Sequence, residues 1–561
     1  MDLKFFYREQ TTGNTGWISV NFGITNPIYG KPEKYSPNAG FSVLFHLSEG
    51  GEELVFLGKK ISIFCLSPIK INKTGMIYKH SLQSVMITVM IMLLPLTSCT
   101  TSPVEPVVPP VVRNDTLPSP GIEMVYPVPS ESQLEWQDSE LVMFIHFGMN
   151  TFTDSDYGTG AEHPSLFNPP AVNVKQWVSV AKEAGFKYLI LTAKHHDGFC
   201  LWPSEQTEHS VKNSPYKNGQ GDIVKEFADE CRAQGVKFGY YLSIWDMNSP
   251  VYGTNAYNAY YLAQTLELCT KYGEVGEIWL DGFLGRNPSV THSQFDWLGF
   301  AQLSKSLQPK SLMAIMGPDI RWVGNEDGVG SETDWSFTWS HTSHHGIGNV
   351  EVWWPTECDV SIRPSWFYHD YQDPYVKTPA QLVDLYLKSV GRNSNLLLNV
   401  PPMRDGNFNE IDVASLKGFR TLLNEIFALD LLRGKKAIAN NSREGDTLWG
   451  PSCAVDGDGR TFWVTDHGIK KAELEVDLGG NAKVNYFRIE EAIRYGQRVR
   501  GFEIQGQING SWVYLTEGTT IGRSRILKLE VPMEVTKLKL VIKDSRGAPA
   551  IRTFSAFYYN K

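Results

Sequence analysis

The chain has 561 residues, of which 42% are hydrophobic and 12% aromatic, and its formal net charge is −9. This length exceeds one ordinary domain, and this composition suits packed cores rather than disorder, so we expect two or three domains. The acidic balance and the lack of a basic stripe argue against nucleic acid as a partner.

The N-terminal region combines an irregular segment with a targeting pattern. Residues 1–75 show no clear period, and we predict a non-domain extension there. A short positive region then precedes a 13-residue apolar run at 84–96, which is too short to span a bilayer and is typical of a signal peptide. The sequence "LTSC" ending at Cys99 resembles a bacterial lipobox, in which the cysteine is lipidated. We therefore predict a lipoprotein signal peptide over 76–99.

A proline-rich stretch follows the predicted lipidation site. Residues 100–120 carry repeated prolines, which make a stiff, extended tether. A lipid on Cys99 would anchor the protein to a membrane. We therefore expect a lipid-anchored protein of the bacterial cell envelope, facing the periplasm or exposed at the cell surface.

Residues 121–432 alternate between short apolar runs and helical segments. Strands are predicted at 141–148, 187–198, 236–246, 277–282, 311–317, 350–355 and 395–402, and helices at 174–185, 222–235, 257–273, 293–308, 380–391 and 410–430. Nearly continuous apolar strands are typical of a parallel sheet covered on both faces. The repeat predicts an α/β fold, a (β/α)8-like barrel. A doubly wound open sheet is the alternative, but no G-x-G-x-x-G follows the first strand.

Polar residues stand where several predicted strands end. They are His146, the adjacent His195 and His196 with Asp197, the pair Trp245–Asp246, and Asp281. Catalytic groups of such barrels lie at the carboxyl ends of strands, although a single Asp there can also cap the next helix. The three histidines and Asp281 suit either a zinc site or a ring of donors around a polyhydroxylated ligand. The adjacent histidines would point to different sides if both were in a strand.

Four motifs in this region resemble one known family. "FIHFG", "AKHHDGF.LWPS", "WLDG" and "RWVGNEDG" resemble glycoside hydrolase family 29, the α-L-fucosidases, over about residues 125–430. The resemblance implies a (β/α)8-like barrel and a retaining, double-displacement mechanism with Asp281 as the nucleophile. It also implies that His146, His195 and His196 bind fucose. Further substrate contacts are expected from Trp202, Tyr241, Glu162 and Trp353.

A retaining enzyme needs a second carboxyl about 5–5.5 Å from the first. Glu326 in "RWVGNEDG" lies 45 positions after Asp281, and this arrangement resembles the subgroup that acts on α1,3- and α1,4-linked fucose. Trp322 is expected to shield it from water and raise its pKa. Glu351 and Glu357 are the alternatives for this role.

The expected activity is therefore exo-acting release of terminal α1,3/1,4-linked L-fucose from Lewis-type glycans, with no cofactor and no metal in the catalytic site. The alternatives are a broad-specificity α-L-fucosidase, a hydrolase for another sugar, and a catalytically inactive glycan-binding lipoprotein.

Residues 433–561 alternate apolar and polar positions in short runs, which predicts a β-sandwich. "CAVDGDGRTFWVTD" (453–466) resembles the start of a discoidin-like or carbohydrate-binding module. Asp456 and Asp458 are candidate ligands for Ca²⁺, but such Asp-Gly sequences also form turns without metal.

Overall fold

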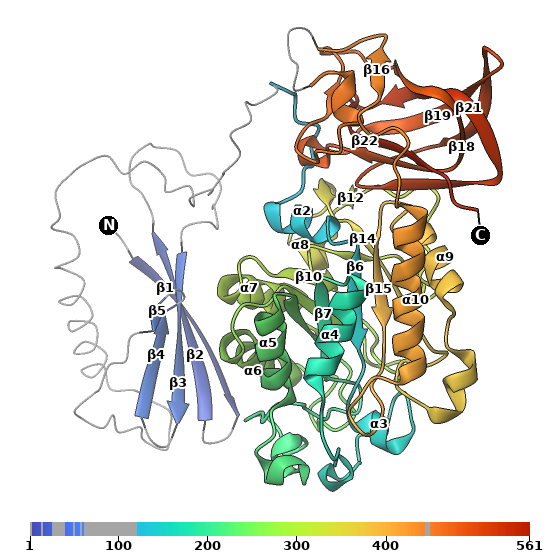
Figure 1. Ribbon diagram of the computed structural model, residues 1–561. Helices are drawn as coiled ribbons and strands as arrows, with labels where there is room; N and C mark the ends of the chain where they lie inside the picture. Colours follow the sequence, from blue (N-terminus) through green and yellow to red (C-terminus); the bar gives the residue numbers. More distant parts are fainter. Residues whose placement is uncertain are drawn as a thin grey trace. The chain divides into compact units, whose positions relative to one another are not determined.

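The computed structural model describes residues 121–443 and 449–560 in full, and only the backbone of five strands before them. The chain divides into two compact units, Met1–Pro118 and Ser119–Lys561 (Figure 1). The first contains an antiparallel sheet of β1 (Leu3–Thr12), β2 (Thr15–Ile24), β3 (Gly40–Ser48), β4 (Gly51–Phe56) and β5 (Lys59–Lys60), in chain order. The side chains of this sheet are not described, so the interpretation of 1–75 as a non-domain extension stays a prediction. The signal peptide, Cys99 and the tether lie outside the described residues.

Eight parallel strands form the centre of the second unit. Their order is β10 (Leu312–Ile315), β9 (Glu277–Asp281), β8 (Lys237–Ser243), β7 (Tyr188–Lys194), β6 (Leu141–Ile145), β15 (Asn395–Asn399), β14 (Thr356–Ser361) and β11 (Arg321–Trp322). The barrel is nearly closed, with β10 and β11 at the two ends of the paired order. This confirms the (β/α)8-like prediction and rules out the doubly wound sheet.

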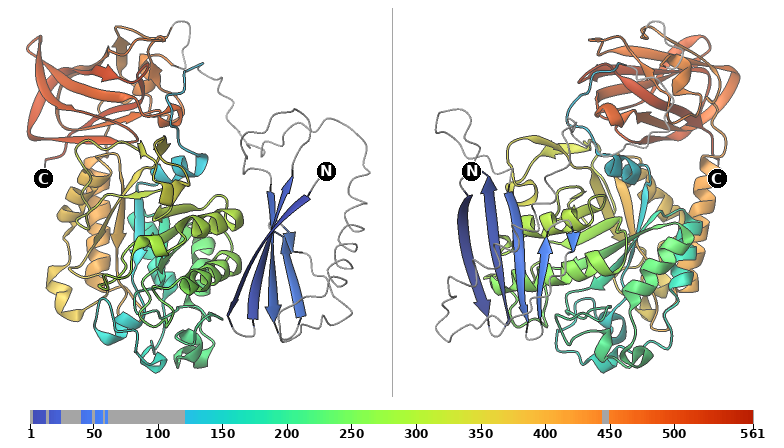
Figure 2. Two further views of the ribbon diagram at one scale, coloured as in Figure 1. Left: turned by 180° about the vertical axis from the view of Figure 1, so that it is seen from behind. Right: turned by 90° about the vertical axis from the view of Figure 1, so that its left-hand side faces the viewer.

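Helices cover the outside of these strands (Figure 2). They are α4 (Val174–Ala184), α5 (Ile223–Gln234), α6 (Ala256–Lys271), α7 (Trp297–Leu307), α9 (Pro379–Ser389) and α10 (Glu410–Ile426), while α2 (Glu131–Gln137) precedes β6. The boundaries have local causes. The Asn173 side chain accepts from the Gln176 amide at the start of α4, and Gly185 ends the helix in the left-handed conformation.

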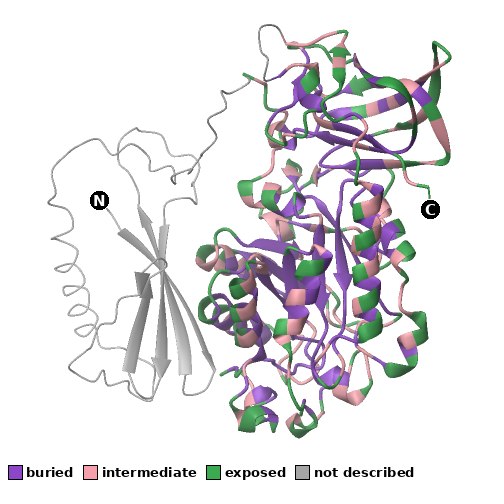
Figure 3. Cartoon of the chain, viewed as in Figure 1, coloured by how far each residue is buried: buried purple, intermediate pink, exposed green. Residues whose placement is uncertain are grey.

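The barrel strands are buried along their length (Figure 3), and the side chains of each strand alternate between two apolar layers. On β6, Val142 and Phe144 belong to the cluster inside the barrel, while Met143 and Ile145 pack with the surrounding helices. On β9, Trp279 is an inward residue. Because side chains alternate with a period of two, the residue two positions beyond Trp279 continues inward at the carboxyl end of the strand. That residue is the acid of "WLDG".

The predicted strand at 350–355 is wrong as a barrel strand. This segment contains β13 (Glu351–Trp353), which forms an antiparallel hairpin with β12 (Phe337–Trp339). The barrel strand begins just afterwards, as β14, and its interior carries two buried carboxyl groups, Glu357 and Asp359. Those polar residues hide β14 from a search for apolar runs.

The C-terminal part is an antiparallel β-sandwich with its own apolar core. Its strands are β16 (Lys436–Ala439), β17 (Trp463–Val464), β18 (Ala472–Glu491), β19 (Val499–Ile508), β20 (Ser511–Gly518), β21 (Arg525–Ser545) and β22 (Ala550–Phe557). Register shifts interrupt the pairing of the long strands β18 and β21. Arg488 and Arg523 of this sandwich pair with Glu140, which directly precedes β6. The predicted all-β fold is thus confirmed.

Candidate active site

Asp281 ends β9 with both carboxylate oxygens hydrogen-bonded. The Tyr241 hydroxyl donates to Oδ2 at 2.6 Å, and the Phe283 amide donates to Oδ1 at 2.7 Å. Burial raises the pKa of Asp281, while these two hydrogen bonds lower it. Since 18% of its side chain stays exposed, a ligand can reach the carboxylate.

Three histidines gather beside Asp281. The ring centroids of His146 and His195 are 5.5 Å apart, and those of His195 and His196 are 4.0 Å apart. His196 Nε2 lies 3.8 Å from Asp281 Oδ2. The structure therefore brings together four of the residues that the strand ends indicated, whereas Asp246 pairs with Lys194 instead.

His195 and His196 would point to different sides only in a strand, and the strand ends before them. The pairing of β7 with β8 shifts register between Thr192 and Lys194, and β7 ends at Lys194. The Lys194 ammonium donates to Asp246 and to Gln264 of α6, outside the barrel. The two histidines that follow lie outside the strand, and both rings are on the side of Tyr241 and Asp281.

Glycine allows the turn after β7 to close. Gly198 has a φ of +83°, and a Cβ at this position would lie 2.4 Å from Asp246 Oδ1. Any other residue would be strained in this conformation and would displace the Asp246 carboxylate. The "HHDG" sequence therefore fits the backbone that presents His195 and His196.

The three imidazoles are neutral in this setting. Burial lowers the pKa of His146 to about 3, and burial together with the Lys194 charge lowers that of His196 to about 3. The pKa of His195 is lowered well below its ordinary value, by burial and then by the two other histidines. A neutral imidazole offers one N–H donor and one nitrogen acceptor, which suits sugar hydroxyls.

Aromatic rings surround this polar cluster. Tyr241 stacks on His195 at 5.6 Å between centroids, and the half-buried Trp366 lies 5.2 Å from His146. Four more rings also lie against His195 or His196: Phe367, Tyr157, Trp245 and Phe283. They come from connecting loops, where aromatic residues give no periodic signal. The site has the aromatic walls expected for a carbohydrate.

Glu326 is the second carboxyl of the site. It lies in the loop after β11, where burial raises its pKa, a hydrogen bond from the Trp366 side chain lowers it, and the charge of Asp281 raises it. The two acids are thus within electrostatic reach of each other. The Trp322 indole N–H donates to Asp359 Oδ1 at 2.7 Å, and shielding of Glu326 by Trp322 stays a prediction.

Asp359 is a third carboxyl near this pair, and sequence reasoning missed it. It is buried on β14, and burial raises its pKa to about 7, with further raising contributions from Glu326 and Asp281. A carboxyl group inside a barrel strand gives no motif from which its position near Asp281 and Glu326 could be predicted.

The alternative acids lie away from Asp281. Glu351 is exposed on the β12–β13 hairpin, where Oε2 lies 3.2 Å from Arg546 Nη2. Glu357 is buried inside the barrel at the start of β14 and accepts from the Trp279 indole at 3.0 Å. Neither position favours protonation of a leaving group at the mouth of the barrel.

Two predicted substrate contacts are corrected by their surroundings. Trp202 has no exposed surface, and its indole N–H donates to Glu267 Oε2 of α6 at 2.7 Å. Trp353 ends the hairpin below β14, and its indole N–H donates to Gln137 of α2 at 2.9 Å. Because α2 precedes β6, Trp353 lies at the amino end of the strands, opposite Asp281. Both tryptophans pack the protein interior.

Glu162 holds its own loop together. Its Oε1 accepts from the Thr159 amide at 2.6 Å and from the Thr159 hydroxyl at 2.8 Å. In the described part of the chain, no hydrogen bond or ion pair joins Glu162 to the three histidines or to Asp281. A substrate contact for Glu162 stays a prediction.

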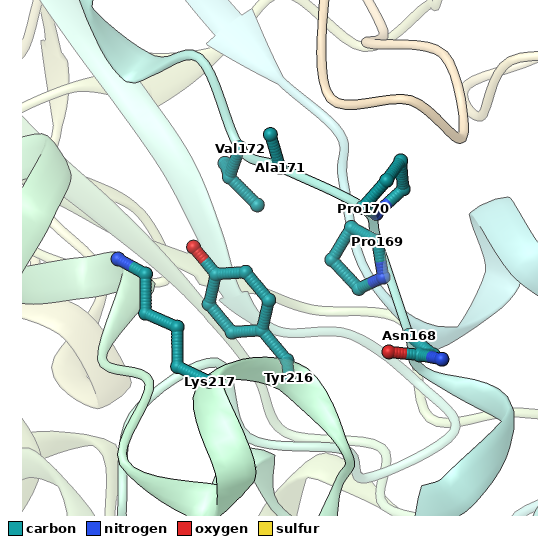
Figure 4. A pocket seen from close by; sticks show the side chains of 7 residues that line it. All are labelled: Asn168, Pro169, Pro170, Ala171, Val172, Tyr216 and Lys217. Atoms are coloured by element: carbon teal, nitrogen blue, oxygen red, sulfur yellow. The ribbon is translucent and has the colours of Figure 1, made fainter.

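A separate surface depression of about 460 Å³ lies elsewhere on the barrel (Figure 4). Its lining comes from the loop before α4 and from a 3-10 turn: Asn168, Pro169, Pro170, Ala171, Val172, Tyr216 and Lys217. It contains no carboxylate, so it offers no counterpart to the Asp281 pair.

The candidate calcium ligands of the sandwich are engaged by protein donors. Asp458 accepts from the Arg460 guanidinium at 2.6 and 2.9 Å, and Asp456 accepts from the Thr461 hydroxyl at 2.7 Å. Among residues 121–443 and 449–560, no group of three or more His, Cys, Asp or Glu is arranged to hold a metal ion. A calcium ion in this domain stays a prediction.

In the same described ranges, no helix combines the length and apolar character needed to cross a membrane.

Comparison with known proteins supplies two family matches. Residues 124–425 match the α-L-fucosidase family model, and residues 436–554 match the F5/8 type C domain. The chain is similar to α-L-fucosidase 1 of Arabidopsis thaliana, with 42% identity over 455 residues that cover 78% of this chain and 88% of that protein.

Solved structures agree with these matches. A putative α-L-fucosidase from Bacteroides thetaiotaomicron is 35% identical with a TM-score of 0.72, covering 78% of this chain and 99% of that one. A Ruminococcus gnavus glycoside hydrolase family 29 fucosidase, solved with fucose, is 29% identical with a TM-score of 0.73, covering 80% of this chain and 98% of that one.

Proposed function

The chain belongs to the α-L-fucosidase family of glycoside hydrolases, and within it we propose an exo-acting, retaining enzyme that releases α1,3/1,4-linked L-fucose from Lewis-type glycans. The observation that carries this proposal is the Asp281 site, where an accessible and firmly held carboxylate lies among three neutral histidines. A catalytically inactive glycan-binding protein is not favoured, because both carboxyl groups of the proposed mechanism are present.

The mechanism proceeds in two displacements. Asp281 attacks C1 of fucose, oriented by the Tyr241 hydroxyl and the Phe283 amide, while Glu326 protonates the departing oxygen. Glu326 then takes a proton from water, and that water releases fucose from Asp281 with retained configuration. The raised pKa of Glu326 suits an acid that must carry its proton near neutral pH. No cofactor takes part in these steps.

The buried histidines support action on a terminal sugar. His146, His195 and His196 are all at least nine-tenths buried, so the sugar they contact lies deep in the barrel mouth rather than across an open groove. Neutral imidazoles can donate to and accept from its hydroxyls. We infer that the rest of the glycan extends outward past Glu326.

Linkage specificity is tested by comparing substrates. If a galactose on the same N-acetylglucosamine contributes to transition-state binding, Lewis a and Lewis x trisaccharides are cleaved far better than 2′-fucosyllactose or a nitrophenyl fucoside. Removing that galactose then costs on the order of 2–4 kcal/mol in kcat/KM, the equivalent of a few hydrogen bonds. Comparable kcat/KM values on all these substrates would favour a broad-specificity enzyme instead.

We also propose that the protein is a lipoprotein of the bacterial cell envelope, anchored through Cys99. The support is the lipobox-like sequence and the proline-rich tether after it. Cys99→Ser should move the protein from the membrane fraction to the soluble fraction, because the lipid would be its anchor. Persistent membrane association of this variant would overturn the proposal.

A further inference from the structure

Two asparagines contact the histidines of the active site. The hydrogen bonds of each asparagine allow only one orientation of its side-chain amide. Asn150 lies in α3 (Met149–Thr153), after β6, and Asn399 ends β15. Both side chains are fully buried. Because their amides contact His195 and His146, they can decide which ring nitrogen of each histidine carries the proton.

The amide of Asn150 is oriented by a backbone carbonyl. Its Nδ2 donates to the Asp156 carbonyl oxygen at 3.1 Å, and the same Nδ2 lies 3.3 Å from His195 Nδ1. A carbonyl oxygen only accepts, so a flipped amide would place two acceptors against each other. His195 Nδ1 therefore accepts the second amide proton, and the ring proton is on Nε2.

The amide of Asn399 is oriented by the same logic, with the opposite result. Its Nδ2 donates to the Trp366 carbonyl oxygen at 2.8 Å and to Ser361 Oγ at 2.9 Å. Its Oδ1 accepts from the His146 backbone amide at 3.3 Å and lies 2.8 Å from His146 Nδ1. That oxygen can only accept, so His146 carries its proton on Nδ1 and leaves Nε2 as an acceptor.

Ser243 fixes the tautomer of His196 in the same way that Asn399 fixes the tautomer of His146. The Ser243 hydroxyl donates its single proton to the Trp245 carbonyl at 2.8 Å, so its oxygen accepts from His196 Nδ1 at 2.7 Å. His196 Nε2 is then also an acceptor, 3.8 Å from Asp281 Oδ2. A hydroxyl that donates to His196 would thus lie beside the reacting carboxylate.

We propose that Asn150 and Asn399 are positioning residues that hold His195 and His146 in opposite tautomers, so that the pocket offers one N–H donor and one nitrogen acceptor to neighbouring oxygens of the sugar. The proposal deepens the proposed function and rests on it, because it takes the histidines as sugar contacts. Neutral imidazoles are required, and burial supplies that condition by lowering the pKa values of His146 and His195. A sugar then binds with its hydroxyl protons directed away from His195 and toward His146.

The tautomers are measured directly on the full-length protein labelled with ¹⁵N-histidine, by two-bond ¹H–¹⁵N correlation NMR without ligand. His195 and His146 are assigned by the signals missing from His195→Gln and His146→Gln. We expect the proton on Nε2 of His195 and on Nδ1 of His146. Identical tautomers of the two rings would overturn the proposal, and this readout depends neither on activity nor on the folding of any asparagine variant.

The variant Asn150→Asp tests the link to binding. A carboxylate in place of the amide donor moves the ring proton of His195 to Nδ1, or keeps the imidazole doubly protonated. We expect kcat/KM on nitrophenyl fucoside to fall about 100-fold and the inhibition constant of free L-fucose to rise about 10-fold, and Asn150→Ala to lose less, about 10-fold in kcat/KM. Thermal unfolding shows whether each variant folds.

Two further variants complete the comparison. Asn399→Asp retains an acceptor for His146 Nδ1, so His146 keeps its tautomer and kcat/KM falls less than in Asn150→Asp. The control is Asn173→Asp, which adds a carboxylate in the same βα loop as Asn150. Residue 173 caps α4, and Asp caps a helix as well as Asn does, so the tautomers of His146 and His195 and the value of kcat/KM should stay unchanged. Undiminished kcat/KM and L-fucose affinity in folded Asn150→Asp would overturn the positioning role. A wild-type protein that fails to cleave any fucoside would instead contradict the proposed function and leave the tautomer result standing.

Discussion

Strand β9 places a carboxylate at each of its ends, and the two ends of the barrel give these carboxylates opposite surroundings. Glu277 begins the strand fully buried and accepts from the Trp136 indole at 2.9 Å. Burial raises its pKa to about 8, and Glu357 beside it has a pKa raised well above the ordinary value by burial and by the charge of Glu277. Asp281 ends the same strand with 18% of its side chain exposed and with two hydrogen-bond donors.

The difference shows that the position along a barrel strand, rather than the residue type, decides what a carboxylate can do. At the amino end, α2 and the β12–β13 hairpin seal the barrel, with Trp136 fully buried and Trp353 bonded to Gln137. Because burial raises both pKa values, this sealed carboxyl pair favours a protonated form, and it meets no substrate. At the carboxyl end the loops leave an opening, so Asp281 can react.

Apart from loss of the nucleophile itself, the largest effect is expected at the open end, from Glu326→Gln. This change removes the proton donor, so kcat/KM on a Lewis trisaccharide should fall by about 10²–10⁴. A nitrophenyl fucoside, whose leaving group departs without protonation, should lose much less. Parallel kinetics on both substrates check this prediction, and equal losses would exclude Glu326 as the acid.

Tyr241→Phe weakens the hold on Asp281 and should lower kcat/KM by about 10–100-fold. The lost hydrogen bond lowers the pKa of Asp281, so its removal raises that pKa. The nucleophile must be ionised, and the acid limb of the kcat/KM profile should therefore move to higher pH. An acid limb that stays in place would show that Asp281 does not control it.

The same substitution at each end sharpens the comparison. Trp366→Phe removes the hydrogen bond that lowers the pKa of Glu326, so the alkaline limb of the profile should move to higher pH, with about a tenfold change in kcat/KM. Trp353→Phe leaves the buried Gln137 amide oxygen without its donor and should cost about 1–3 kcal/mol of stability.

Kinetics and thermal unfolding of the two variants separate these roles. The activity of Trp353→Phe should stay within about twofold of wild type, since substitutions remote from the site act through stability. A large loss of kcat/KM in Trp353→Phe at full folding would return that residue to the substrate site.

The smallest effect is expected at the sealed end, from Glu357→Gln. The raised pKa values mean that the folded protein binds more protons than the unfolded chain above the ordinary glutamate pKa of 4.5, so stability falls as pH rises through the range up to about 8. The amide cannot titrate and removes the repulsion, so the melting temperature should depend less steeply on pH between 5 and 8. Thermal unfolding across this range tests the prediction, and an unchanged slope would contradict it.

The sequence allowed the open end to be predicted better than the sealed one. Asp281 and the histidines follow apolar strands, and family motifs support them, so both their identity and their proximity could be predicted. Strand β14 could not, because Glu357 and Asp359 break its apolar pattern from inside the barrel. A motif also does not say which end or face a side chain occupies, which explains the wrong interpretations of Trp202 and Trp353.

The loops are the other part that sequence reasoning could not supply. Tyr157, Trp245 and Phe283 reach His196 from connections that have no period. Asn150 and Asn399 act through hydrogen bonds to partners 45 and 253 positions away, which only the folded backbone brings together.

The role of Asp281 is tested most directly by Asp281→Gly with added azide. Loss of the nucleophile should lower kcat on nitrophenyl fucoside by on the order of 10³ or more, because no covalent intermediate can form. Azide fits the space of the missing carboxylate and should restore turnover, with β-fucosyl azide as the product. Undiminished activity in Asp281→Gly, or an α-fucosyl azide product, would contradict attack by Asp281 at the open end of the barrel.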